Sequence, residues 1–246
     1  IRASGSVREV VEPIVSIVLS PYGGNPTKVP NEDSQSFEFD DTNVFSHSRL
    51  PGLDRWEGGP RMNFGVKLGG YGYSGGYSTA MIGQSYRFKA DSTFADRTGL
   101  ESKRSDFVGR LAISPSKYLD YMQRVRLDRD DFGIRRNELD LVVGPEWLTL
   151  DLGYLSLSRE LTTRDLPSRK ELRIMALSRF NDSWSASMHS RRDLTDDGGS
   201  LAHGLALTFQ DECIVFTTRF GRTFTQDRDV QPASSLTFRV RLKGLG

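Results

Sequence analysis

The chain has 246 residues, of which 37% are hydrophobic and 26% charged, and its mean hydropathy is −0.45. This composition is too polar for a helical membrane protein. The most apolar run, residues 14–19, is far shorter than the roughly 18 residues that a spanning helix needs. The 33 basic and 32 acidic residues nearly balance, so no strong field marks nucleic acid as a partner.

Short turns alternate with longer polar links along the chain. The short turns lie at residues 71–76, 115–117, 144–146, 181–183 and 210–213. Such alternation is typical of a transmembrane β-barrel, with tight turns on one side of the membrane and long loops on the other. We predict about twelve strands, near residues 12–20, 61–71, 76–89, 105–114, 118–128, 134–144, 146–158, 170–180, 184–191, 201–210, 214–225 and 235–243.

Several of these strands alternate apolar with polar side chains. In the last one, the apolar residues Leu236, Phe238, Val240 and Leu242 alternate with Thr237, Arg239, Arg241 and Lys243. One face is therefore apolar and the other cationic, which fits a lipid-facing wall around a wet lumen.

Aromatic side chains cluster beside the short turns, at Tyr73, Tyr77, Tyr118, Tyr121, Trp147, Phe180, Trp184, Phe209 and Phe216. A ring of aromatic residues at one height is the interfacial girdle of a membrane barrel. A general preference of aromatic residues for strands would explain their presence but not this clustering. We therefore expect an all-β fold, a transmembrane antiparallel β-barrel, with a soluble sandwich or propeller as the alternative.

The link at residues 21–60 is much longer than the others. It is rich in Asp, Asn, Gly and Pro, yet it contains Phe37, Phe39, Phe45 and Trp56. A loop of this length is usually functional or disordered, and its aromatic residues indicate that it packs against something.

Two segments of this link resemble the LptD family of Gram-negative lipopolysaccharide-assembly proteins. They are Phe-Asp-Asp-Thr-Asn-Val-Phe at residues 39–45 and Arg-Leu-Pro-Gly-Leu-Asp-Arg at residues 49–55. Residues 78–88 resemble the family's strand after the next turn, and residues 238–246 its closing strand. Cys213 sits where the family carries a cysteine or an adjacent cysteine pair, although this chain has a single cysteine.

The resemblance implies that residues 1–246 are the C-terminal portion of one larger barrel domain, integral to the Gram-negative outer membrane. We also expect the loop near 21–60 to be extracellular and to fold inward as a plug, because its aromatic residues and its Gly-Leu-Asp-Arg turn are poorly suited to full solvation. Ile1 opens on mixed polar sequence without a signal peptide, so we expect a mature chain or a fragment. The alternative is a complete twelve-stranded barrel, such as a small porin, an autotransporter or an outer-membrane hydrolase.

The function that the resemblance implies is insertion of lipopolysaccharide into the outer leaflet through a lateral gate of the barrel, without a cofactor. The implied partners are lipopolysaccharide, outer-membrane lipid, an LptE-type lipoprotein in the lumen, and the periplasmic Lpt bridge, which docks on an N-terminal domain outside this sequence. The competing reading, a porin, predicts an open aqueous lumen.

The expected site residues form four groups. The plug group comprises Phe39, Asp40, Asp41, Phe45, Gly52, Asp54 and Arg55. Within it, we expect Asp54 and Arg55 to anchor the loop through charge-assisted hydrogen bonds. The gate strand carries Leu236, Phe238, Arg239, Val240, Arg241 and Leu242. The lumen cations are Arg124, Arg126, Arg173 and Arg179, although arginines also line ordinary porins. Cys213 is the disulfide candidate, expected to pair with a cysteine of the N-terminal part.

Catalysis has little support in the sequence. The three histidines, His47, His189 and His203, do not converge with a Ser and an orienting polar partner. No cluster has the spacing of metal ligands. We therefore expect no enzyme, and no catalytic, cofactor or metal site.

Overall fold

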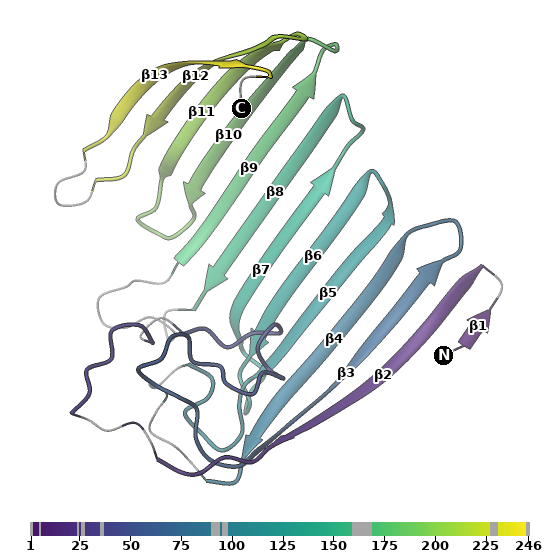
Figure 1. Ribbon diagram of the computed structural model, residues 1–246, viewed down its shortest axis with the longest axis vertical. Helices are drawn as coiled ribbons and strands as arrows, with labels where there is room; N and C mark the ends of the chain where they lie inside the picture. Colours follow the sequence, from purple (N-terminus) through teal and green to yellow (C-terminus); the bar gives the residue numbers. More distant parts are fainter. Residues whose placement is uncertain are drawn as a thin grey trace. The chain divides into compact units, whose positions relative to one another are not determined.

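The computed structural model describes residues 2–4, 6–23, 25, 28–34, 37–89, 94, 98–158, 169–226 and 231–244. The regular elements in this part of the chain are β-strands (Figure 1). They are β1 (Arg2–Ser4), β2 (Val7–Val18), β3 (Arg61–Gly72), β4 (Tyr77–Arg87), β5 (Phe107–Ser116), β6 (Leu119–Leu127), β7 (Ile134–Val143), β8 (Leu148–Leu157), β9 (Arg169–Arg179), β10 (Trp184–Asp193), β11 (Ser200–Gln210), β12 (Ile214–Thr223) and β13 (Ala233–Leu242). No described helix is long and apolar enough to cross a membrane.

The strand order in the sheet is the order of the chain, from β1 to β13. The registers of β1 to β5 and of β9 to β13 are antiparallel throughout. Antiparallel neighbours need only a hairpin connection, so alternating short turns and longer links can build the whole order. The predicted all-β antiparallel class is confirmed. The described strands do not close the sheet, and β1 and β13 are its edges.

The twelve predicted strands are all present, but the start of the chain differs from the prediction. The first predicted strand, near 12–20, is β2 and begins at Val7, and the three-residue β1 was not predicted. Glu9, Glu12 and Pro13 mask the strand pattern. Pro13 is tolerated because β2 pairs there only with β3, at Val66, while β1 reaches only the first residues of β2.

Contacts divide the chain into two compact units. Unit 1 comprises Ile1–Pro115, Met122–Glu138 and Leu157–Ser168, and unit 2 comprises Ser116–Tyr121, Leu139–Ser156 and Arg169–Gly246. The connection between β2 and β3, residues 19–60, lies in unit 1 and is called the long loop below. Strands β9 to β13 lie in unit 2.

The register of β11 to β13 separates apolar from polar side chains. Leu205 and Leu207 lie opposite Phe220 and Thr218, and Phe220 lies opposite Leu236. Because side chains alternate along a strand, the intervening residues project from the other face. These include Arg219, Arg239 and Arg241. The predicted division into an apolar and a cationic face therefore holds for β13, whereas Arg222 of β12 shares the apolar side with Phe220.

In unit 1, Gly65 of β3 makes room for the long loop. A Cβ atom at this position would lie 2.4 Å from the carbonyl oxygen of Ile82 and 2.9 Å from Cζ of Phe45. The first contact is with the backbone of β4, which cannot turn away as a side chain can.

We predict that Gly65→Ala destabilises unit 1 by about 1–3 kcal/mol, the usual cost of overpacking. The measurement is the thermal loss of β-sheet circular dichroism in detergent. Gly70→Ala is the matched control on the same strand, because its Cβ would meet nothing closer than 3.9 Å. Equal thermal unfolding midpoints for Gly65→Ala and Gly70→Ala would contradict the prediction.

Candidate functional site

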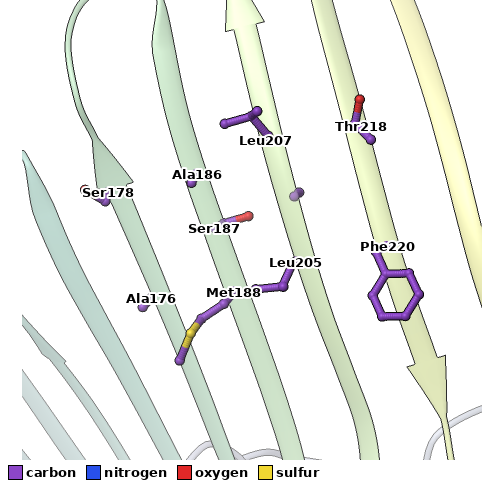
Figure 2. Close-up of a pocket in the computed structure, with 10 residues that line it drawn as sticks. Ala176, Ser178, Ala186, Ser187, Met188, Leu205, Leu207, Thr218 and Phe220 are labelled. Carbon is purple, nitrogen blue, oxygen red and sulfur yellow. The ribbon is translucent and has the colours of Figure 1, made fainter.

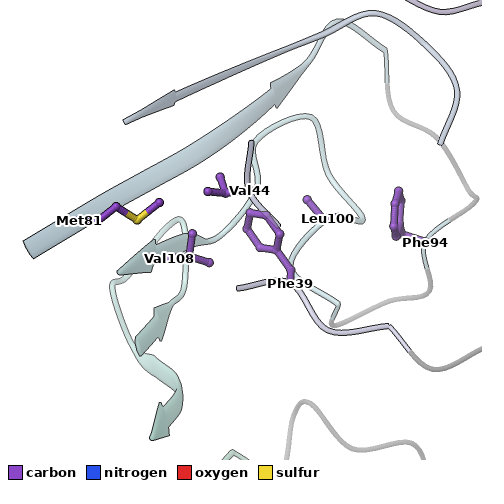
Figure 3. Close-up of a cluster of buried hydrophobic side chains, with 6 residues drawn as sticks. All are labelled: Phe39, Val44, Met81, Phe94, Leu100 and Val108. Atoms are coloured by element: carbon purple, nitrogen blue, oxygen red, sulfur yellow. The ribbon is translucent and has the colours of Figure 1, made fainter. Parts of the chain in front are cut away.

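The long loop contributes side chains to the hydrophobic core of unit 1. Phe39 and Val44 are completely buried, and they pack with residues from outside the loop (Figure 3): Met81, Phe94, Leu100 and Val108. Phe37, Phe45 and Leu50 pack against this cluster. Gly83 of β4 accommodates the loop as well, since a Cβ there would lie 3.3 Å from Val44. The long loop is therefore folded against strands and is not a solvated link.

One buried carboxylate, Glu57, lies among three arginines. Its Oε2 accepts hydrogen bonds from Nε and the backbone N–H of Arg49, at 2.8 and 3.2 Å. Its Oε1 accepts from Nη2 of Arg49 and of Arg87. Nε of Arg61 lies 3.5 Å from the same oxygen. All four residues are at most 5% exposed.

This Glu57 cluster connects the long loop with β3 and β4. Arg61 opens β3, and it lies directly opposite Arg87, the last residue of β4. Two arginines at facing positions repel each other unless a carboxylate lies between them. Burial by itself would raise the pKa of Glu57, but the hydrogen bond from Arg49 and the three guanidinium charges outweigh it and lower that pKa.

Aromatic rings complete the cluster. The guanidinium carbon of Arg87 lies 4.3 Å from the centroid of Phe94, and that of Arg49 lies 5.5 Å from the centroid of Phe39. Cation–π contacts are strongest where water is excluded. The Glu57 cluster and the hydrophobic core are thus one packed body.

A second carboxylate of the long loop, Asp41, reaches β5 and β6. Its oxygens lie 3.5 Å from Arg110 and 3.5 Å from Arg124. Burial is the largest influence on Asp41 and raises its pKa. The neighbouring backbone is held too, because Nη1 of Arg126 donates to the carbonyl oxygen of Phe39 at 3.3 Å.

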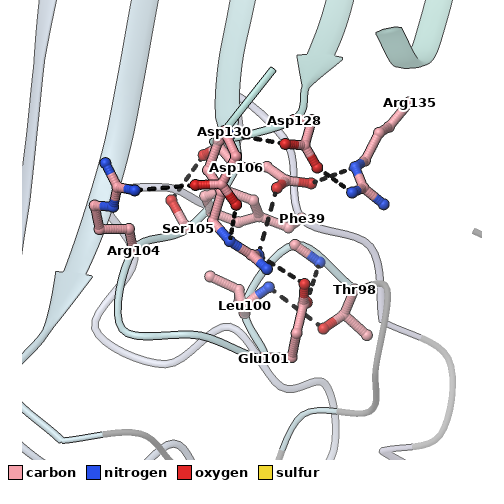
Figure 4. Close-up of polar contacts among 12 residues, drawn as sticks. Phe39, Thr98, Leu100, Glu101, Arg104, Ser105, Asp106, Asp128, Asp130 and Arg135 are labelled. Atoms are coloured by element: carbon pink, nitrogen blue, oxygen red, sulfur yellow. Dashed lines mark hydrogen bonds and ion pairs between the residues drawn. The ribbon is translucent and has the colours of Figure 1, made fainter. Parts of the chain in front are cut away.

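A third charged group lies beside β6 and β7 (Figure 4). Buried Asp106 has Arg126, Arg129 and Arg135 at 3.9, 3.7 and 3.8 Å. These distances are too long for hydrogen bonds, and burial raises the pKa of Asp106. The pKa of Asp128, in contrast, is lowered to about 2. The largest cause is the hydrogen bond from the backbone N–H of Asp130, and the hydrogen bond from the Arg135 side chain comes next.

The predicted Gly-Leu-Asp-Arg segment makes its contacts inside the long loop. The Asp33 carboxylate accepts from the backbone N–H of Leu53 and of Asp54, at 2.7 and 3.1 Å. Asp54 in turn accepts from the N–H of Glu32 at 2.8 Å. Arg55 donates to the carbonyl oxygen of Val29 at 2.7 Å. The segment fastens one part of the loop to another.

The remaining plug residues have local roles. Gly52 has φ of +76°, a conformation that favours glycine. Asp40 accepts from the N–H and hydroxyl of Thr42, at 2.8 and 2.6 Å, and so forms a turn. Among the predicted plug residues, Phe39, Phe45 and Asp41 are those that pack against or pair with the strands.

The other predicted residues lie in unit 2. Nη2 of Arg173 lies 3.1 Å from Asp140 and 3.3 Å from Asp151. The backbone N–H of Arg179 donates to the carbonyl oxygen of Trp147 at 2.9 Å. The gate residues Leu236, Phe238, Arg239, Val240, Arg241 and Leu242 pair with β12, and all are exposed.

Cys213 lies in the short turn between β11 and β12. Its side chain is a free thiol and is exposed. Its N–H donates to Asp211, and its carbonyl oxygen accepts from the N–H of Lys243, at 2.8 and 2.7 Å. Leu245 and Gly246, the end of the predicted closing motif, lie outside the described residues.

The residues of the Glu57 cluster, namely Arg49, Glu57, Arg61 and Arg87, were not predicted from the sequence. One signal was available, because aligning the predicted strands near 61–71 and 76–89 around their turn sets Arg61 against Arg87. Such a like-charge pair requires a carboxylate from elsewhere in the chain. Nothing in the sequence pattern shows that Glu57 supplies it.

Comparison with protein families gives a match to LptD, described as LPS transport system D, over residues 2–184. The matched region runs from β1 to the first residue of β10 and includes the long loop. A search of curated proteins found no match.

We predict that Glu57→Ala loosens the long loop, because it removes the carboxylate that three buried arginines share. Removing one partner of a buried ion pair costs about 3–5 kcal/mol. The measurement is limited proteolysis within the long loop, together with the thermal midpoint. Glu32→Gln is the control, an exposed carboxylate of the same loop. Cleavage of Glu57→Ala at the rate of Glu32→Gln would refute the anchoring role.

Proposed function

We propose that this chain, which belongs to the LptD family, forms part of the barrel wall through which lipopolysaccharide reaches the outer leaflet of the outer membrane. The family is one of lipopolysaccharide transport and of outer-membrane β-barrels. In this proposal the chain is the C-terminal portion of the barrel, and the lipid leaves sideways through a seam in the wall.

The edge of β13 is the observation that supports a seam. All ten residues of β13 are exposed, and in the described part of the chain it pairs only with β12. An unpaired edge is not tolerated in hydrocarbon, where water cannot satisfy its N–H and C=O groups. We therefore assign the free edge to the first strand of a barrel half outside this sequence, as a contact that opens for the lipid.

The two faces of β13 suit such a passage. Leu236, Phe238, Val240 and Leu242 give an apolar side for acyl chains, while Arg239 and Arg241 give a cationic side for phosphorylated sugar. Arg173, whose side chain is 47% exposed, extends the cationic path in this proposal. In this proposal Arg124 and Arg126 serve chiefly to hold the long loop, since both contact it or the charged group beside it.

The long loop is proposed to act as the plug. Its packing against β3 to β6 gives it a fixed shape, which a plug needs and a solvated loop lacks. The proposed partners are those of the family: lipopolysaccharide, an LptE-type lipoprotein in the lumen, and the periplasmic bridge. A porin would instead require an open aqueous lumen, which a packed loop of this length disfavours.

The seam is tested by locking it. Engineered cysteines should join β13 to the first barrel strand of the full-length protein, at residues that face each other across the seam. We expect cross-linking to block lipopolysaccharide export, with normal export after reduction as the control. Normal export through a fully cross-linked seam would show that the lipid takes another route.

Cys213 is proposed to form a disulfide with a cysteine in the N-terminal part of the full-length protein, because short turns of such barrels face the oxidising periplasm. Its exposure leaves the thiol accessible. We expect Cys213→Ser to change the mobility of the full-length protein on non-reducing gels, and to leave reducing gels unchanged. Identical non-reducing mobility would exclude the bond.

A further inference from the structure

The apolar face of unit 2 contains a groove of about 480 Å³ over β9 to β12 (Figure 2). Small side chains line it on β9 and β10, namely Ala176, Ser178 and Ala186. Larger ones line it on β10 to β12, namely Met188, Leu205, Leu207 and Phe220. These four larger side chains are between 43% and 58% exposed, so the groove presents open apolar surface.

The rows of residues beyond the groove differ at its two ends. Towards the short turns, Trp184 lies opposite Phe209, with ring centroids 5.1 Å apart, and Phe209 lies opposite Phe216. Towards the longer connections, Ser190 lies opposite His203, and His203 lies opposite Arg222. The groove is therefore bounded by an aromatic row at one end and a polar, cationic row at the other.

Phe224 positions the cationic row. The guanidinium carbon of Arg222 lies 4.9 Å from the centroid of Phe224, and the His203 ring lies 5.2 Å from it, edge on. Arg222 is two residues beyond Phe220, so its side chain leaves the strand on the groove side. Within the described ranges, no carboxylate pairs with Arg222.

The two rows are six residues apart, which is about 20 Å along a strand. An amphiphile with an aliphatic chain and an anionic head fits the sequence of apolar groove and cationic row. Its chain would lie in the groove and its head at Arg222. Short turns of outer-membrane barrels face the periplasm and long loops face outward. The cationic row therefore belongs to the outer leaflet.

We propose that this groove binds one acyl chain of a lipopolysaccharide molecule, with a phosphate of its sugar headgroup at Arg222. The proposal rests on the proposed function, in which this face is the lipid-facing side of the wall and lipopolysaccharide is the lipid that reaches it. Arg suits a phosphate because its planar guanidinium donates two parallel hydrogen bonds. The site lies on β9 to β12, and β12 pairs directly with the edge strand β13.

The test uses the purified full-length protein in detergent with a benzophenone amino acid in place of Leu207. Light should then cross-link added lipopolysaccharide to the groove. A phosphate–arginine contact contributes about 1.5–3 kcal/mol, so Arg222→Gln should raise the half-saturating lipopolysaccharide concentration about 10- to 100-fold. Ala186→Phe, which fills the groove, should abolish the cross-link. The signal of β-sheet circular dichroism checks that each variant is folded.

Matched controls lie on the opposite face of the same strands. Arg219→Gln and Ser185→Phe should leave the cross-link unchanged. Dephosphorylated lipopolysaccharide and phosphatidylethanolamine should compete weakly. The proposal would be overturned if either lipid competed as strongly as unmodified lipopolysaccharide. It would also be overturned if folded Arg222→Gln had an unchanged half-saturating lipopolysaccharide concentration. The assay involves no export, so a failed seam cross-link and a failed groove are separate results.

Discussion

The buried carboxylate of Glu57, which three arginines share, is the group on which the structure of unit 1 depends. Three buried guanidinium groups meet there, and the Glu57 carboxylate offsets their mutual repulsion. Burying charge is costly unless it is paired and hydrogen-bonded. The arrangement therefore requires the long loop to return to the start of β3 in one conformation, with Phe39 and Val44 packed alongside.

The charged groups of unit 1 differ in how well they are satisfied. Glu57 and Asp128 accept close hydrogen bonds, and their pKa values are lowered. Asp41 and Asp106 have arginines at longer distances, and burial raises their pKa values. Glu57 is thus bound more closely to β4, through Arg87, than Asp41 is bound to β5 and β6.

Unit 2 differs from unit 1 in its packing, because its described residues include no buried hydrophobic core. The large exposed apolar side chains of β10 to β13 lie on one face, as expected where lipid replaces a protein core. The groove interrupts that face with small residues, and the cationic row lies at the end that a headgroup would occupy. In the proposed function, the wall, the seam and the groove are surfaces that contact the same lipid in turn.

The sequence by itself determined the all-β class and most strand positions, because alternation with a period of two and turn residues are local signals. It missed β1, since three residues carry no periodicity, and it started β2 late, since Glu9, Glu12 and Pro13 obscured the pattern. It also separated the two faces of β13. Each of these features depends on neighbouring residues in the chain.

Only the tertiary structure decided what holds the long loop. Glu57 lies 30 residues from Arg87, and Phe39 lies 87 residues from Arg126. Such contacts depend on register and loop closure, which no local pattern encodes. The same holds for the groove, because Ala176, Ala186, Leu207 and Phe220 are adjacent only once four strands pair. The conspicuous Gly-Leu-Asp-Arg segment pointed to the right loop, but the strand contacts come from residues on either side of it.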